Sequence, residues 1–240
     1  MSVALTISFI THTTMARSLI PAILTTMSLA LSSVALANED KITKGYYSYD
    51  AMGCMLMREC KKDVKEVFSM LDISSNYENT EAFTSVTAEF NNMLSSLNDV
   101  GVKVYLADER YFPVGHRGVY HTVSNNFFLN KEYMDSPRVL MTVMRHEGWH
   151  AAQDCMAGSI KNSMIAIIMP EEDVPDLWRE MVERTYPSSA VPWEAEATWA
   201  GKTEGMTMKA LKACAEGNMW TVYEPTPLTR KWLEEEGFIK

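Results

Sequence analysis

Residues 135–153 have the sequence DSPRVLMTVMRHEGWHAAQ, and the fold and the chemistry expected of the chain both start from this stretch. Asp135-Ser136-Pro137 provides a polar N-cap followed by proline at the first helical position. This combination predicts a helix that begins here and runs to about Gln153. The apolar positions expected to face the core are Val139, Leu140, Val143 and Met144.

The predicted helix contains the motif H-E-x-x-H as His146-Glu147-Gly148-Trp149-His150. Residues four apart lie on one face of an α-helix about one turn apart, so His146 and His150 can present ring nitrogens to a single metal ion. Glu147 lies beside them, where its carboxylate can take a proton from the water that attacks a substrate. The motif therefore predicts a catalytic zinc site with two histidine ligands and Glu147 as the general base.

A catalytic zinc site usually has three protein ligands, so the third must come from elsewhere in the chain. A further helix is expected over 192–215, and its first turns contain Glu194 and Glu196. Two such positions differ by about 200° around the helix, so only one of them can face the metal. If Pro192 is the first helical residue, Glu194 is the third and completes the helix cap, which leaves Glu196 as the expected ligand and Glu194 as the alternative. The second choices, with nitrogen donors, are His116 and His121.

Hydrophobic periodicity in the rest of the chain indicates an α+β fold. Further helices are predicted over 54–71, 81–100, 176–184 and 228–236. Strands bounded by polar turns are predicted over 102–106, 118–123 and 127–129, and we expect them to form a small, mostly antiparallel sheet. The first of these strands alternates in the manner of a strand with one buried face.

These features resemble the zincin metallopeptidases, specifically the gluzincins typified by thermolysin, in which an H-E-x-x-H helix follows a small sheet and precedes a glutamate on a later helix. The resemblance covers about residues 102–213 and implies a zincin-like sheet packed on the motif helix, with further helices C-terminal to it. It implies Zn²⁺ bound by His146, His150 and Glu196. It also implies that Glu147 acts as the general base on a peptide or protein substrate.

The chain departs from the thermolysin pattern near the third ligand. Ala195 precedes Glu196 where that pattern has asparagine, and Ala200 replaces an acid four residues later. The carboxylate that usually supports a ligating histidine must therefore come from elsewhere, and Asp154 is the candidate. An oxyanion partner is also expected, for which the candidates are Tyr186 and Tyr223.

The first 37 residues have the parts of a secretory signal peptide, namely a single cation, an apolar stretch and a small-x-small end. Cleavage leaves 38–240 as a single expected domain. A start at Met15 would give a signal of ordinary length, so Met15 is an alternative to Met1 as the first residue of the natural chain. We expect an exported protein, periplasmic or extracellular.

Export predicts that the four cysteines are oxidised. Four cysteines allow three pairings, and we favour Cys54–Cys60 with Cys155–Cys214. The second of these bonds would tie the end of the motif helix to the helix expected to carry the third ligand.

The formal net charge of -9 argues against a surface that gathers nucleic acid, because phosphate binding needs clustered basic side chains. No contact with a membrane is expected after signal cleavage. The expected function is that of an exported zinc-dependent hydrolase, a peptidase. The alternatives are a non-catalytic zincin-like module that binds a protein or cell-wall partner, and an exported copper-handling protein that uses the Met- and Cys-rich segment 52–60.

Overall fold

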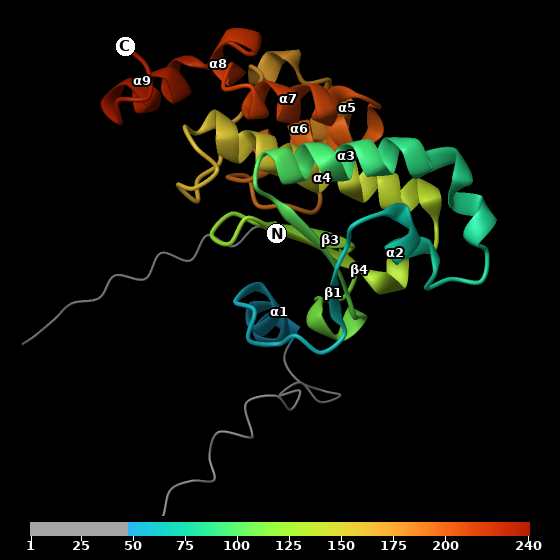
Figure 1. Cartoon of the computed structure of the whole chain (residues 1–240). Helices are drawn as coiled ribbons and strands as arrows, with labels where there is room; N and C mark the ends of the chain where they lie inside the picture. The colour runs from blue at the N-terminus through green and yellow to red at the C-terminus, as the bar shows by residue number, and fades with distance from the viewer. Residues whose placement is uncertain (1–47) are drawn as a thin grey trace, which may run out of the picture. The chain divides into compact units, whose positions relative to one another are not determined.

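The computed structural model describes residues 48–240. The predicted signal peptide and the choice between Met1 and Met15 lie outside the described residues. The helices are α1 (Ser48–Leu56), α2 (Met70–Ser74), α3 (Thr87–Asp99), α4 (Pro137–Met156), α5 (Asp176–Glu183), α6 (Val191–Lys202), α7 (Met206–Ala215), α8 (Met219–Val222) and α9 (Pro227–Glu235) (Figure 1). The strands are β1 (Val64–Glu66), β2 (Lys103–Ala107), β3 (Gly118–His121) and β4 (Asn126–Asn130). The predicted α+β class is confirmed.

The four strands form one mixed sheet in the order β1-β2-β4-β3. The outer pairs, β1 with β2 and β4 with β3, are antiparallel, but β2 and β4 run parallel, with Val104 opposite Phe127 and Leu106 opposite Leu129. Two of the three pairings are thus antiparallel, as expected of a mostly antiparallel sheet, and only the central pairing is parallel. In the β3–β4 hairpin, β4 is the inner strand and pairs with β2. Among the described residues, β3 has no strand on its other side and forms a free edge of the sheet.

Both faces of the sheet are buried, and side chains alternate between the two faces as strand geometry requires. One face joins the main core beneath α3 and α4 through Val104, Leu106, Phe127 and Leu129. The opposite face packs against α1 and includes Tyr105 and Phe128. The strand over 102–106 is thus not half-buried as expected, because α1 covers its second face.

The prediction of a single helix over 54–71 is wrong. The chain leaves the helix after Leu56, turns through a loop closed by the Cys54–Cys60 disulfide, and then forms the short strand β1 before α2. Arg58 and Asp63 have φ values of 59° and 56°, a left-handed conformation that ends a helix. Apolar residues of this segment consequently enter two different cores instead of one helix face.

Helix α4 confirms the predicted helix and lies at the centre of the fold. It packs against α3, α6, α7 and the edge strand β3, and Figure 1 shows α3 and α4 together between the sheet and the C-terminal helices. The helix expected over 192–215 is interrupted, because Gly205 has φ 80° and separates α6 from α7. Within residues 48–240, no helix has both the length and the apolar character needed to cross a membrane.

Candidate metal centre

Two glycines set the distance between α4 and its neighbouring helices. A Cβ atom on Gly201 of α6 would lie 3.1 Å from the Thr142 carbonyl oxygen and 3.2 Å from His146 Cβ. A Cβ atom on Gly148 of α4 would lie 3.0 Å from Thr207 Cγ2 on α7, so a glycine at this position of the motif lets the two helices approach closely. Because Glu194 lies seven residues before Gly201, it shares the same face of α6 and is directed at α4.

His146, His150 and Glu194 converge between α4 and α6, with one potential ligand atom from each within 4.8 Å of the others. Oε2 of Glu194 lies 3.3 Å from His146 Nε2 and 3.7 Å from His150 Nε2. Tetrahedral zinc, with bonds of about 2.0–2.1 Å to oxygen and nitrogen, separates its ligands by about 3.4 Å. The three side chains could therefore hold a metal ion without moving far.

The Glu194 carboxylate gives a second reason to expect a ligand. Its Oε2 atom is buried and accepts no hydrogen bond within the described residues. A buried carboxylate oxygen without a hydrogen-bond donor is costly, and a metal ion between it and the two imidazoles would satisfy it. The donor set of two imidazole nitrogens and one carboxylate oxygen suits zinc and several other divalent transition metals.

The charged states of the cluster reflect competition between burial and attraction. Burial alone would raise the pKa of Glu194, but His150 and His146 lower it well below its usual range. Burial alone would lower the pKa of His150, yet the carboxylates of Glu194 and Glu147 raise it to about 9. Without a cation the site therefore takes up a proton, and a bound divalent cation would replace that charge.

Gln153 fixes the orientation of His150. Its Oε1 lies 2.8 Å from His150 Nδ1, while its Nε2 donates to the Trp193 carbonyl and to Glu196 Oε2 at 3.0 and 2.8 Å. Because Gln153 donates with its nitrogen to those two acceptors, its oxygen faces His150 and the Nδ1 of His150 carries the hydrogen. When His150 gives up its second proton to bind a metal ion, that tautomer leaves the Nε2 lone pair available for the metal.

Glu196 is held by hydrogen bonds inside the protein and does not face the candidate metal site. Its carboxylate accepts hydrogen bonds from Trp149 Nε1 at 3.1 Å and from the backbone N–H groups of Ile168 and Met169 at 3.0 and 2.6 Å. Burial raises the pKa of Glu196, and these donors together with Gln153 lower it in part. Glu196 thereby joins α4, α6 and the loop before α5, and it is turned away from the two histidines.

The preference for Glu196 over Glu194 as the third ligand therefore does not match the positions of the two side chains. The two do face different directions, as their spacing requires. The error lies in the helix start: α6 begins at Val191 after Ala190, so Glu194 is the fourth helical residue and does not take part in a cap. Glu194, the alternative ligand, is the carboxylate that meets His146 and His150.

Glu147 lies beside the cluster and touches the edge of the sheet. Its Oε2 accepts a hydrogen bond of 2.8 Å from the backbone N–H of Tyr120 on β3. The close approach of β3 depends on Gly118, where a Cβ atom would lie 2.6 Å from Val143 Cγ1 and 3.2 Å from Glu147 Cγ. The candidate general base is thus positioned between the metal ligands and the free edge of β3.

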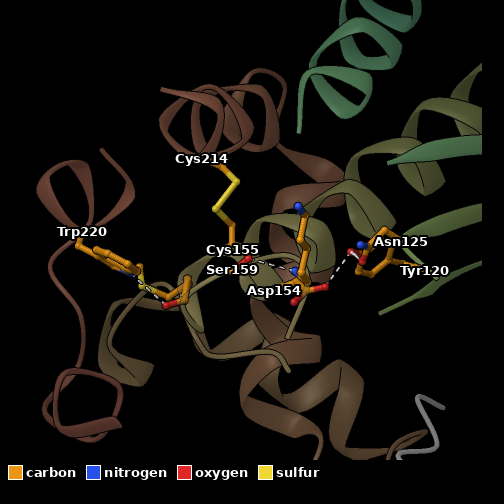
Figure 2. The surroundings of a disulfide bond; sticks show 9 residues. Tyr120, Asn125, Asp154, Cys155, Ser159, Cys214 and Trp220 are labelled. Atoms are coloured by element: carbon orange, nitrogen blue, oxygen red, sulfur yellow. Dashed lines mark hydrogen bonds between the residues drawn. A yellow bond between two sulfur atoms is a disulfide. The ribbon is translucent and has the colours of Figure 1, made fainter. Parts of the chain in front are cut away.

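Asp154 does not support a ligating histidine, contrary to expectation. Its carboxyl group is fully buried and accepts a hydrogen bond of 2.8 Å from the Tyr120 hydroxyl. Figure 2 shows the Tyr120 side chain directed at Asp154, near the Cys155–Cys214 disulfide, and the Tyr120 hydroxyl also lies 3.3 Å from Asn125 Oδ1. Burial raises the pKa of Asp154 to about 8, with the Tyr120 hydrogen bond acting in the opposite direction. The supporting role behind His150 belongs to Gln153, three residues along the same helix, a spacing that could have indicated it.

The two candidate oxyanion tyrosines have different surroundings. Burial raises the pKa of Tyr186 well above its usual range, and the nearby carboxylates of Glu194 and Glu147 raise it further. Tyr186 also lines an open pocket of about 390 Å³. Tyr223 packs instead against Trp149, with ring centroids 6.5 Å apart, and its ring lies beneath Lys209.

The remaining candidates lie outside the cluster. His121 Nδ1 lies 2.7 Å from the Ser124 hydroxyl, and neither His116 nor His121 belongs to the metal-ligating group found among residues 48–240. Both predicted disulfides, Cys54–Cys60 and Cys155–Cys214, are present. Oxidised sulfurs are not available as copper ligands, and the neighbouring Met55 is fully buried against the sheet.

No protein-family model, curated protein or solved structure matches the chain. The structure shows an α+β fold with a His-His-Glu group that could hold a metal ion. The two disulfides are compatible with an exported protein. Any more specific function must be proposed from the chemistry of the site.

Proposed function

We propose that the protein is an exported, zinc-dependent peptidase of zincin-like chemistry, with His146, His150 and Glu194 as metal ligands and Glu147 as the general base. The observation that carries this proposal is the buried Oε2 of Glu194, which accepts no hydrogen bond among the described residues and faces the Nε2 atoms of His146 and His150. Glu147, next to His146, lies at the free edge of the sheet. A zinc ion held there supplies Lewis-acid polarisation of the substrate carbonyl and lowers the pKa of a water to about 7.

Glu147 accepts the proton of the attacking water and then passes it to the leaving amine. The Tyr120 N–H holds one oxygen of its carboxylate in place, and no described residue donates a hydrogen bond to the other oxygen. One oxygen is therefore oriented by the protein while the other is available for proton transfer. This arrangement suits a general base, because the carboxylate must keep its orientation while it accepts and passes on the proton.

Tyr186 is the better of the two candidates for an oxyanion partner. Its raised pKa keeps the phenol protonated, so it can donate a hydrogen bond to an oxygen that becomes negative during the reaction. Tyr223 packs on Trp149 instead and is assigned a structural role.

The free edge of β3 supports a peptide substrate over other substrates of hydrolases. Asn130 N–H donates to the Arg117 carbonyl, so by antiparallel alternation residues 117, 119 and 121 face β4, whereas Gly118 and Tyr120 face away from it. The Tyr120 N–H already reaches Glu147. The backbone groups of Gly118 are then positioned to pair with an extended peptide by strand addition.

The test uses zinc-loaded protein and a mixture of synthetic peptides, with cleavage read by mass spectrometry. Wild-type protein should cleave some of the peptides, and Glu147→Gln should lower the rate by at least about a thousandfold while still binding one zinc ion. Cleavage that persists in Glu147→Gln would contradict the role of Glu147. Stoichiometric zinc without any cleavage by the wild-type protein would favour the non-catalytic zincin-like module.

A further inference from the structure

Basic side chains gather around the first turns of α4, before His146. Lys202, at the end of α6, places its ammonium 3.5 Å from the Thr142 hydroxyl of α4. Burial lowers the pKa of Lys202, and the charges of Arg138, Arg117 and Arg145 lower it further. These side chains come from α4, α6 and the residue before β3, so the fold brings together cations that are far apart in the sequence.

Among the described residues, three of these four cations have no acidic partner. Arg145 is bound by both oxygens of Glu89, with two N–O distances of 2.6 Å. For Arg117, Arg138 and Lys202, no carboxylate of residues 48–240 lies within ion-pair distance. We name these three side chains the cationic rim. Such a group is unexpected in a chain with a formal net charge of -9, where acidic side chains are in excess.

The cationic rim borders the metal centre. Arg117 precedes Gly118, which packs against Glu147, and Lys202 follows Gly201, which packs against His146. Thr142, which Lys202 contacts, lies one helical turn before His146, a rise of about 6 Å. An extended peptide advances about 3.3 Å per residue, so a group about two residues from the reacting bond would reach the rim.

We propose that the cationic rim binds a carboxylate of the substrate about two residues from the bond that is cleaved. This inference rests on the proposed function and adds the substrate class: peptides with an acidic residue, or a chain-terminal carboxylate, at that distance. Arginine forms charge-assisted, often bidentate hydrogen bonds with carboxylates, and lysine supplies a flexible second charge. Backbone pairing at β3 alone would not distinguish peptides by their side chains, whereas the rim would favour peptides with a negative charge.

The experiment measures the binding of three hydroxamate-capped dipeptides to zinc-loaded protein by calorimetry at low salt. The probes end in Leu-Gln amide, which is neutral, in Leu-Glu amide, which has a side-chain carboxylate, and in Leu-Gln free acid, which has a terminal carboxylate. One acidic probe should bind about tenfold more tightly than the neutral probe, and high salt should reduce the difference. A preference for Leu-Glu amide would show that the rim binds a side-chain carboxylate, and a preference for the free acid would show that it binds the terminal carboxylate.

Variants of the rim separate this inference from the proposed function. Lys202→Gln and Arg117→Gln should each reduce the preference for the acidic probe and leave binding of the neutral probe unchanged. Lys212→Gln is the matched control, because Lys212 is an exposed lysine of α7 that pairs with Glu216 and lies outside the rim. Equal binding of all three probes to the wild-type protein would overturn the proposed role of the rim and would not affect the proposed metal centre. Failure of the neutral probe to bind would overturn the proposed function, and the rim's role with it.

Discussion

Tyr120 and Glu147 are joined by a hydrogen bond of 2.8 Å from the backbone N–H of the tyrosine to Oε2 of the glutamate. The Tyr120 hydroxyl also bonds to Asp154, two turns further along the same helix as Glu147. One residue of the edge strand thus contacts α4 at two points, one next to the metal ligands and one in the core. The orientation of the candidate general base therefore depends on the position of β3.

Gly118 should be intolerant of a side chain. Gly118→Ala would place a Cβ atom 2.6 Å from Val143 Cγ1 and 3.3 Å from the Phe128 carbonyl oxygen. We expect this overpacking to lower the free energy of unfolding by about 1–3 kcal/mol and to move β3 away from Glu147, so hydrolysis should fall as well. Denaturant unfolding and peptide hydrolysis measure the two effects.

Gly53→Ala is the control for this change. Gly53 lies within α1, and a Cβ atom there would have no heavy atom within 4 Å. Alanine should stabilise that helix by up to about 1 kcal/mol. If both alanine variants had the same stability and activity as the wild-type protein, the close packing of β3 on α4 would be contradicted.

Asp154 should make stability depend on pH. Its pKa is about 8 in the folded protein against an ordinary value of 3.8, so the unfolded chain releases this proton at lower pH than the folded protein. The stabilisation of the folded protein by protonated Asp154 is therefore fully present below about pH 4 and is lost as the pH rises towards 8. Over this range the free energy of unfolding should fall by up to about 1.4 kcal/mol per pH unit.

Urea unfolding of the wild-type protein and of Asp154→Asn at several pH values tests this dependence. The variant lacks the titrating group but keeps an oxygen that can accept the Tyr120 hydrogen bond. Its stability should fall less steeply between pH 5 and 8 than that of the wild-type protein. Parallel pH profiles for the two proteins would show that Asp154 titrates normally.

Gln153 should support metal binding without touching the metal. Gln153→Met has a similar volume but removes the acceptor for His150 Nδ1 and the donor to Glu196. We expect zinc affinity to fall by about 10- to 100-fold, the usual effect of losing a group that orients a ligating histidine. Competition with a chromophoric chelator measures the affinity, and circular dichroism confirms folding. Unchanged affinity in the folded variant would remove Gln153 from the site.

The parts of the site that follow from local sequence could be predicted. The N-cap, proline and apolar spacing of 135–153 place α4, and the spacing of His146 and His150 requires only helix geometry. The pairing of Cys155 with Cys214 also agreed with the structure. The helix and its histidine spacing are determined by residues close together in the sequence. The cysteine pairing required a choice among only three alternatives.

The parts that depend on contacts between distant segments could not be predicted. The choice between Glu194 and Glu196 depends on a helix start one residue earlier than expected and on backbone donors at Ile168 and Met169, which lie in a loop without periodicity. The parallel pairing of β2 with β4 likewise depends on how a hairpin docks, which side-chain alternation does not specify.

The zinc content of Glu194→Gln and Glu196→Gln tests the central claim most directly. Each variant is stripped of metal, reloaded with zinc, dialysed, and analysed for metal per folded protein beside the wild type. Wild-type protein should hold one zinc ion, Glu194→Gln should lose it, and Glu196→Gln, although less stable, should retain it when folded. One zinc ion retained by Glu194→Gln and lost by Glu196→Gln would contradict the assignment of Glu194 as the third ligand.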